Sequence, residues 1–148
     1  MDLKSTIQTD LKDAMRHGEE TRKSTLRMAL SAIKLAEVEK GAHLLDEAAY
    51  LAIIQKEIKA RREAIADAER AHRPELITQA EQEIIILQGY LPPAFSQEEL
   101  EVLVKAAIEE VGATSIREMG QVMKILVLRL QGRASNDQAS QVVRKLLQ

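Results

Sequence analysis

The residues best suited to chemistry in this 148-residue sequence are cations near its C-terminal end, where Gly132 and Arg133 precede a short predicted helix. A guanidinium beside the unpaired backbone N–H groups that begin a helix forms a corner that attracts anions, and a phosphate would fit it. Residues 112–148 hold six Lys or Arg and two Asp or Glu, which gives a net charge of +4. We therefore predict a phosphate-binding surface that contains Lys124, Arg129, Gly132, Arg133, Arg144 and Lys145.

The same charges can also be explained as an ordinary solvated helix surface, and this alternative stays open. Basic side chains near the C-terminus of a helix interact favourably with the helix dipole whatever the function. The preceding residues, 96–111, hold one Lys and five Glu, which gives a net charge of −4. A secondary basic cluster spreads around more than half of a helix circumference, which favours a solvated surface; it consists of Lys56, Lys59, Arg61 and Arg62.

The residue patterns that catalysis and metal binding need are absent from the sequence. It contains no cysteine, and its three histidines stand apart without zinc-binding spacing. The six glycines are scattered, mostly at predicted helix ends, so they form no phosphate loop. We therefore predict no catalytic residues, no metal and no cofactor.

Aromatic residues are scarce, with two Tyr, one Phe and no Trp. Binding of single-stranded nucleic acid by base stacking uses several exposed aromatic side chains, so this class of binding is excluded. No stretch approaches the roughly 18 apolar residues that a membrane span needs, and the first residues lack the apolar core of a signal peptide. We expect a cytoplasmic protein that does not bind membranes.

Helical periodicity dominates the chain, and helix-capping and helix-breaking residues divide it into seven predicted helices. The first four end before Pro92 and Pro93, which cannot continue a helix, so we place a domain boundary at the string LPPAFS. Asp46 predicts the start of the third helix and Pro74 the first turn of the fourth. These two long neighbours are expected to form an antiparallel hairpin.

Beyond this boundary we expect three shorter helices. Ser96 with Glu99 predicts a capping box at the start of the first of them, and Ser115 with Glu118 predicts another at the second. The third is expected to begin at Ser135 or the residue after it. No segment alternates apolar and polar residues over a useful length, as a half-buried strand would. We therefore predict an all-α fold with an N-terminal four-helix domain, which contains the long helical hairpin, and a small C-terminal three-helix domain, over residues 1–91 and 96–148.

The chain contains four strings in a fixed order that resemble the GatB/YqeY family: LRMALSAIKLAEVEKG, IQKEIKARREAI, GYLPPAFSQEEL and GATSIREMGQVMKILVLRLQGRASNDQASQVVRKLL. The similarity to stand-alone YqeY-like proteins covers essentially the whole chain. It implies two helical domains, the second similar to the tail of the B subunit of glutamine-dependent aspartyl/glutamyl-tRNA amidotransferases, which contacts tRNA. The family label, carbon–nitrogen ligase activity with glutamine as amido-N donor, is expected to be inherited from that larger enzyme.

Two hypotheses of different classes follow. The first is an accessory tRNA-binding protein, in which the C-terminal cations contact phosphates, as recognition of an RNA duplex by its shape requires. The alternative is a protein-interaction adaptor that docks on an aminoacyl-tRNA synthetase or an amidotransferase through the hairpin, with exposed apolar residues such as Ile85 or Ile86. Amidotransferase activity of the chain itself ranks last, because the sequence offers no catalytic residues for it.

Overall fold

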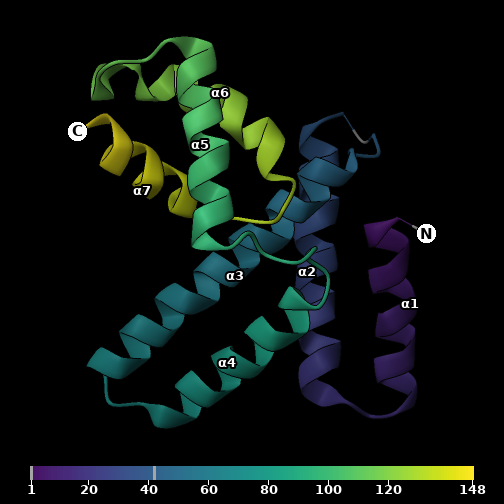
Figure 1. Cartoon of the computed structure of the whole chain (residues 1–148). Coiled ribbons are helices and arrows are strands. Elements are labelled where there is room, and N and C mark those ends of the chain that lie inside the picture. The colour runs from purple at the N-terminus through teal and green to yellow at the C-terminus, as the bar shows by residue number, and fades with distance from the viewer. Residues whose placement is uncertain (1, 42) are drawn as a thin grey trace. The chain divides into compact units, whose positions relative to one another are not determined.

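The computed structural model describes residues 2–41 and 43–148, which form helices joined by short turns and loops (Figure 1). No β-strand occurs among these residues, so the predicted all-α class is confirmed. The chain divides into two compact units, Met1–Leu91 and Pro92–Gln148, here called unit 1 and unit 2. The elements are α1 (Leu3–Arg16), α2 (Glu20–Glu39), α3 (Glu47–Arg70), α4 (Pro74–Gln88), α5 (Gln97–Val111), the 3-10 helix η1 (Ile116–Glu118), α6 (Met119–Leu130) and α7 (Asn136–Leu147).

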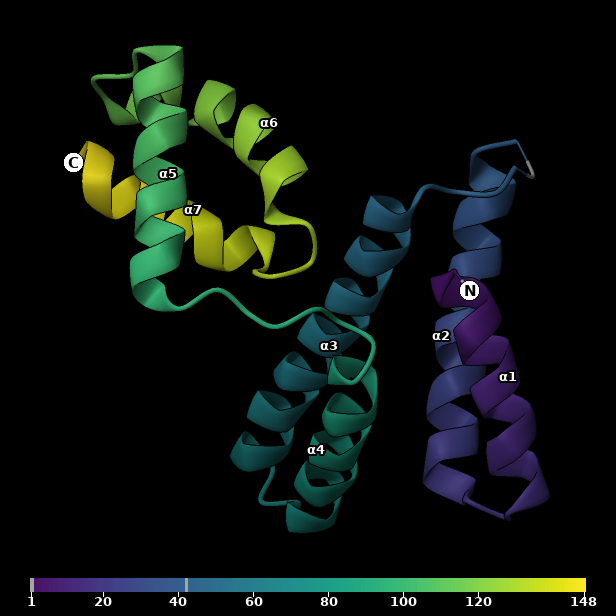
Figure 2. The ribbon, with the colours of Figure 1, turned by 45° about the vertical axis from the view of Figure 1, so that its right-hand side comes forward.

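In unit 1, α1 packs beside α2, and α3 and α4 form the expected antiparallel hairpin (Figures 1 and 2). The carboxylate of Asp46 accepts a hydrogen bond from the backbone N–H of Ala49 at 2.9 Å and so caps α3. Pro74 occupies the first turn of α4, where its missing N–H costs nothing. The starts of both hairpin helices are therefore set by local signals that the sequence predicts.

Unit 1 buries an apolar core to which all four of its helices contribute. The largest fully buried side chains of this core are Ile7, Leu26, Ile33, Ile54, Ile58 and Leu87. Met15 follows Leu3, Ile7 and Leu11 at intervals of four residues, a spacing typical of one buried face, but its side chain is half-exposed. Ala14 takes the buried position in the last turn of α1 because the neighbouring residue points about 100° away from it around the helix.

Unit 2 is a three-helix assembly in which α5, α6 and α7 each contact the other two. Its capping box at the start of α5 is confirmed: the Ser96 hydroxyl accepts from the Glu99 N–H at 3.1 Å, and the Glu99 carboxylate accepts from the Ser96 N–H at 3.0 Å. Gly112 ends α5 with a φ of 74°, a left-handed conformation that glycine adopts without strain. The core contains Leu100, Val104, Ala107, Val122, Leu126, Leu130, Val142 and Val143.

The second predicted capping box, at Ser115 and Glu118, is wrong. The Ser115 side chain makes no capping hydrogen bond. The Glu118 carboxylate instead accepts from the backbone N–H of Thr114 at 3.1 Å and from its hydroxyl at 3.3 Å. Residues Ile116–Glu118 therefore form a 3-10 turn, and α6 begins only at Met119. The spacing of a capping box was present, but the carboxylate found a partner one residue earlier.

Candidate functional site

The predicted phosphate surface lies in unit 2, and Arg133 stands at the turn between α6 and α7. Its backbone carbonyl accepts from the N–H of Phe95 at 2.8 Å, and its guanidinium Nε donates to the carbonyl of Pro93 at 2.9 Å. The guanidinium also stacks over the Phe95 ring, with 4.1 Å between Cζ and the ring centroid. Arg133 therefore holds residues 93–95 against the α6–α7 turn.

The Arg133 guanidinium also extends toward α5. Its Nη2 lies 3.7 Å from a carboxylate oxygen of Glu99, which makes an ion pair at long distance. The pKa of Glu99 is lowered, chiefly because the backbone N–H and side chain of Ser96 hydrogen-bond its carboxylate, and the charge of Arg133 adds to this. This carboxylate thus both caps α5 and contacts the cation.

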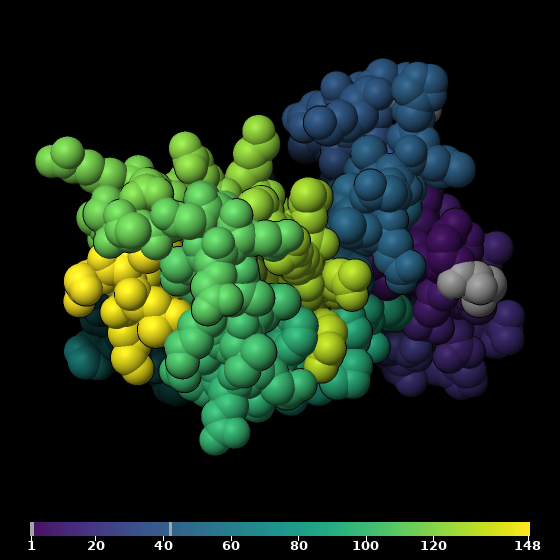
Figure 3. Space-filling model, turned by 45° about the horizontal axis from the view of Figure 1, so that its top comes forward, coloured from purple at the N-terminus to yellow at the C-terminus, as the bar shows by residue number. Residues whose placement is uncertain are grey.

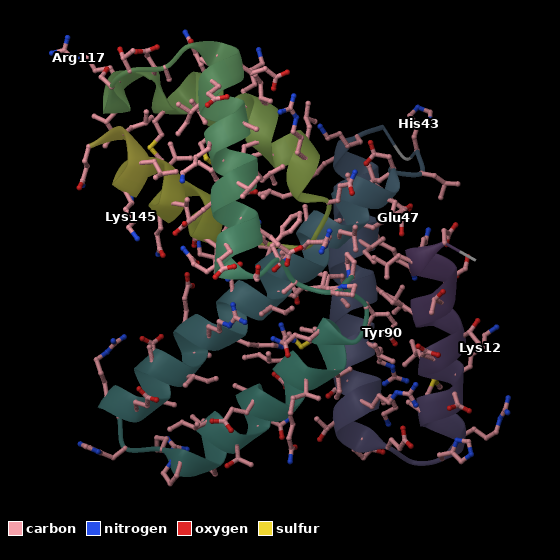
Figure 4. The ribbon with its side chains drawn as sticks, in the orientation of Figure 1. Lys12, His43, Glu47, Tyr90, Arg117 and Lys145 are labelled. Carbon is pink, nitrogen blue, oxygen red and sulfur yellow. The ribbon has the colours of Figure 1, made fainter. Side chains whose placement is uncertain are left out.

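Two further predicted cations, Arg129 and Lys145, also pair with glutamates of α5. Arg129 lies 2.5 Å from Glu110, which lowers the pKa of that carboxyl through the hydrogen bond and the opposite charge and raises the pKa of Arg129. Lys145 lies 4.0 Å from Glu101 and extends from α7 into solvent (Figure 4). The partners of both cations are carboxylates that remain open to water.

Lys124 and Arg144, by contrast, are exposed and make no hydrogen bond or ion pair with the described residues. Lys124 is five positions before Arg129 on α6, so it points about 140° away from the side that meets α5. Arg144 likewise points about 100° away from Lys145. The predicted surface therefore consists of three cations facing α5 and two that lie on other sides of their helices; Figure 3 shows α5 in green beside α6 and α7 in yellow-green and yellow.

The start of α7 is less open to an anion than the sequence suggests. The Ser135 hydroxyl accepts from the Gln138 N–H at 3.1 Å, and the Gln138 side chain accepts from the Ser135 N–H at 2.9 Å. This capping box occupies two of the N–H groups that a phosphate would use. Gly132 has a φ of 76° and follows Gln131 at 50°, so the chain leaves α6 through two left-handed residues.

The secondary basic cluster does not form one surface, because Arg61 is buried. Its Nε donates to Glu83 at 3.0 Å, and its Nη1 donates to the carboxylate of Glu57 at 3.1 Å and to the Glu57 carbonyl at 3.0 Å. Its neighbours Lys56, Lys59 and Arg62 are exposed along α3. Arg61 therefore holds α3 to α4 and is unavailable to a ligand.

A second enclosed network joins α1, α2 and α3 around the buried Glu37. The Lys4 ammonium donates to both oxygens of its carboxylate, at 2.9 and 3.1 Å, and the Tyr50 hydroxyl donates to it at 2.8 Å. These hydrogen bonds, that from Lys4 first, lower the pKa of Glu37, while burial raises the pKa of Tyr50. The N–H of Leu45 donates to the Tyr50 oxygen and so ties the loop before α3 to the same network.

A third network links the end of unit 1 to α1. The Tyr90 hydroxyl donates to Asp10 at 2.5 Å, and burial together with this bond raises the pKa of Tyr90 far above its usual value (Figure 4). Arg22 on α2 lies 3.7 Å from Asp10, 3.4 Å from Asp13 and 3.0 Å from Glu19. The Arg22 guanidinium therefore pairs with three carboxylates, and one of these, that of Asp10, also accepts the hydrogen bond from Tyr90.

Beside Arg22 the start of α2 and the middle of α4 border an open groove of about 410 Å³. Its lining is mainly apolar on the α4 side, where Ile85 is 69% exposed and Ile86 is partly buried. The other lining residues are Glu19, Glu20, Thr21, Arg22 and Gln82. Exposed Ile85 is the feature that the adaptor hypothesis requires.

Two kinds of structure are absent from the described residues. No helix in this part of the chain combines the length and the apolar character that crossing a bilayer requires. No group of three or more His, Cys, Asp or Glu there is arranged to hold a metal ion.

The similarity of this chain to known proteins covers nearly its whole sequence. The family described as Yqey-like protein matches residues 4–147. Three relatives share the name Altered inheritance of mitochondria protein 41, mitochondrial. The protein of Pyrenophora tritici-repentis is 30% identical over 130 residues, which cover 86% of this chain and 71% of the relative. That of Lachancea thermotolerans is 32% identical over 112 residues, 74% of this chain and 60% of the relative. That of Kluyveromyces lactis is 33% identical over 102 residues, which cover 68% of this chain and 55% of the relative. The matched part thus covers less than two thirds of the last two relatives.

Proposed function

Because this chain belongs to the YqeY-like family, we propose that it is an accessory tRNA-binding protein whose unit 2 contacts the phosphate backbone. Duplex RNA offers phosphates and 2′-hydroxyls across a wide, shallow groove, and cations recognise these without aromatic side chains. The choice of tRNA as the ligand rests on the sequence resemblance to the GatB/YqeY family, which implies that unit 2 is similar to the tail of the amidotransferase B subunit. The proposed contacts are Lys124, Arg129, Gly132, Arg133, Arg144 and Lys145.

The observation that supports this proposal is the exposure of the carboxylates that pair with these cations. The side chains of Glu99, Glu101 and Glu110 are 31–55% exposed where they meet their cations. Exposed ion pairs contribute little to stability, because water and salt screen them and both side chains lose freedom. A phosphate can therefore replace such a carboxylate at small cost, because both accept charge-assisted hydrogen bonds from a guanidinium or an ammonium group.

This arrangement makes the α5 glutamates competitors of the RNA, which gives a sharp test. We expect Glu110→Gln to strengthen binding of a tRNA transcript by the full chain, because Arg129 loses its competing carboxylate. Glu109→Gln is the matched control, because it removes the same charge at the neighbouring position. The side chain of Glu109 makes no hydrogen bond or ion pair with the described residues. Fluorescence anisotropy at low salt measures both. Equal effects of the two changes would show that only net charge matters and that Arg129 does not contact RNA.

Charge reversal of the two unpaired cations tests the proposal from the other side. We expect the double change Lys124→Glu and Arg144→Glu to weaken tRNA binding. The plot of log affinity against log salt should also become less steep, by roughly 0.7–0.9 in slope for each phosphate that the protein no longer neutralises. Circular dichroism checks that the fold persists. An unchanged affinity at low salt would remove unit 2 as the site of RNA binding.

The groove beside Ile85 favours a second candidate function, an adaptor that docks on a protein such as an aminoacyl-tRNA synthetase or an amidotransferase. A contiguous apolar surface next to an acidic rim is typical of a protein contact. Ile85→Asp should then abolish co-purification of such an enzyme with the chain while leaving tRNA affinity unchanged. Thr78→Asp, at another exposed position of α4, serves as the control. Loss of tRNA binding in the Ile85 variant alone would contradict this division of labour.

The proposed compartment is the cytoplasm, as the sequence predicts. The relatives named above are mitochondrial proteins by their names, so a mitochondrial location is the competing expectation. Fractionation of the source cells with an antibody against the chain decides between them.

A further inference from the structure

The outward side of α6 carries apolar residues that the core of unit 2 does not use. Leu128 is 77% exposed, Val127 is 43% exposed, and Ile116, at the start of η1, is 46% exposed. Within α6, Lys124, Val127 and Leu128 lie four, seven and eight positions after Gly120, which places these four residues on one side of the helix, and Ile116 precedes them in the 3-10 turn η1. We call this set of five residues the α6 outer face.

Gly120 on this face is not explained by the chain itself. Its φ is not positive, so the backbone does not require glycine there. A Cβ added at this position would meet no atom within 4 Å, so packing inside unit 2 does not require it either. A glycine on an open helix surface does permit a second backbone to approach closely, which a side chain would prevent.

The charge on this side of α6 is of one sign. The helix contains no Asp or Glu, and of its two cations Lys124 lies on this side while Arg129 faces Glu110 of α5. Lys124 makes no ion pair with the described residues, and the same holds for Arg117, whose side chain extends into solvent just before α6 (Figure 4). Cations beside exposed leucine and valine suit a partner that is acidic and apolar at once.

We propose that the α6 outer face docks an acidic amphipathic helix of a protein partner. Val127 and Leu128 pack against its apolar stripe, Gly120 is the point of closest approach of the two backbones, and Lys124 and Arg117 meet its carboxylates. An RNA would satisfy the cations but would leave Leu128 against phosphates, so a protein is the better fit. This inference goes beyond the proposed tRNA binding and does not rest on it.

The test uses the full chain with methyl-labelled Ile, Leu and Val and two synthetic helical peptides as probes. Both peptides carry leucines at helical spacing; one has glutamates beside them and the other has lysines at the same places. We expect the acidic peptide to bind and to shift the methyl signals of Ile116, Val127 and Leu128, and the basic peptide to leave them unchanged. Equal binding of both peptides, no binding of the acidic one, or shifts confined to other methyls would overturn the proposal.

Two variants and a matched control separate docking from folding. Leu128→Glu should weaken binding of the acidic peptide at least about tenfold, because an apolar anchor becomes a like charge. Gly120→Ala should weaken it severalfold while leaving the melting temperature unchanged or higher, since alanine favours a helix. Val102→Glu changes an equally exposed apolar residue of α5 and should have no effect. If Val102→Glu weakens binding as much as Leu128→Glu, the α6 outer face is not the site.

The same signals distinguish a nucleic acid from a protein at this face. We expect a tRNA transcript to leave the methyl signals of Val127 and Leu128 unshifted, even where it competes with the acidic peptide for the shared Lys124. If the transcript shifts those methyls and displaces the peptide, the α6 outer face binds RNA and the protein-docking proposal falls. Lys124, which belongs to both proposed surfaces, is left unchanged in all these variants.

Discussion

Arg61 in unit 1 and Arg129 in unit 2 both pair with glutamates, but only the pairs of Arg61 are enclosed by the fold. The side chain of Arg61 is 7% exposed and that of Arg129 is 38% exposed. Arg61 meets two carboxylates and a backbone carbonyl, whereas Arg129 is paired with Glu110 alone. Arg61 thus fixes helices of unit 1 to one another, while Arg129 of unit 2 lies where a ligand can exchange with its carboxylate partner.

This contrast shows why counting basic residues in the sequence does not locate a binding surface. Unit 1 holds cations that are held by several partners at once, as Arg22 is by three carboxylates. Removing one partner of an enclosed pair leaves a charge without compensation, whereas removing one partner of an exposed pair leaves a solvated charge. Substitutions of enclosed charged residues, such as Arg61, should therefore affect stability far more than substitutions of exposed ones, such as Arg129.

The largest loss of stability is expected from Arg61→Ala. The change leaves Glu57 and Glu83 without their common cation and removes the packed stem of the arginine, so we expect a loss of about 3 kcal/mol in the free energy of unfolding. Urea unfolding followed by circular dichroism measures it. The control is Arg62→Ala, next to it on the exposed side of α3, which should leave the midpoint nearly unchanged. Equal losses in both variants would show that the contrast between the units is wrong.

A smaller loss, about 1 kcal/mol, is expected from Tyr90→Phe, which removes the hydrogen bond to Asp10. The raised pKa of Tyr90 also predicts a dependence on alkaline pH. A group whose pKa is higher in the folded state contributes its full stabilisation below the unfolded pKa, here 10, and loses it as pH rises through the folded value. The wild type should therefore lose stability above about pH 10, and Tyr90→Phe should lose less. Parallel pH profiles of the two proteins would contradict the assignment.

On the acid side Glu37 contributes to the pH dependence of stability, because its bonds to Lys4 and Tyr50 lower its pKa from 4.5. A lowered pKa in the folded state gives stability that is complete above the unfolded value and is lost as pH falls through the folded one. We expect the urea midpoint of the wild type to fall as the pH is lowered below 4.5. Glu37→Gln should be less stable at neutral pH and should show a flatter acid limb. A steeper acid limb in the variant would refute this role.

The smallest effect is expected in unit 2, from Arg129→Gln. Its ion pair with Glu110 is open to water, so the urea midpoint should stay within experimental error of the wild type. The same variant should weaken tRNA binding if the proposed function holds. A midpoint shift as large as that of Arg61→Ala would mean that the unit 2 ion pairs are structural, which would remove the support for exchange with phosphate.

The sequence predicted the features of the fold that depend on neighbouring residues. Asp46, Pro74 and the pair of Ser96 with Glu99 start their helices as expected, because a cap needs only residues one turn apart. The same rule predicted a capping box at Ser115 and Glu118, which does not form because the Glu118 carboxylate accepts hydrogen bonds from Thr114 instead. Local patterns state which bonds can form, and the choice between two local bonds depends on packing.

The candidate site was less predictable because its electrostatics are tertiary. The charges of −4 and +4 in consecutive segments were visible in the sequence, but their mutual pairing became visible only when α5 was placed against α6 and α7. No sequence spacing links Arg129 to Glu110 or Lys145 to Glu101. The burial of Arg61 was equally hidden, because its neighbours include the charged residues Lys59, Arg62 and Glu63, as on an exposed helix surface. The exposure of Leu128 is likewise a property of the packed structure that its apolar type does not indicate.

Both tyrosines of the chain donate their hydroxyl protons to carboxylates, Tyr50 to Glu37 and Tyr90 to Asp10. A carboxylate acceptor quenches tyrosine emission, and the sequence holds no tryptophan to mask the change. Emission should therefore brighten when these bonds break, and it should report on unit 1 only, since the single aromatic residue of unit 2 is Phe95. Tyrosine fluorescence can therefore follow the unfolding of unit 1 without any label, while circular dichroism follows the unfolding of both units.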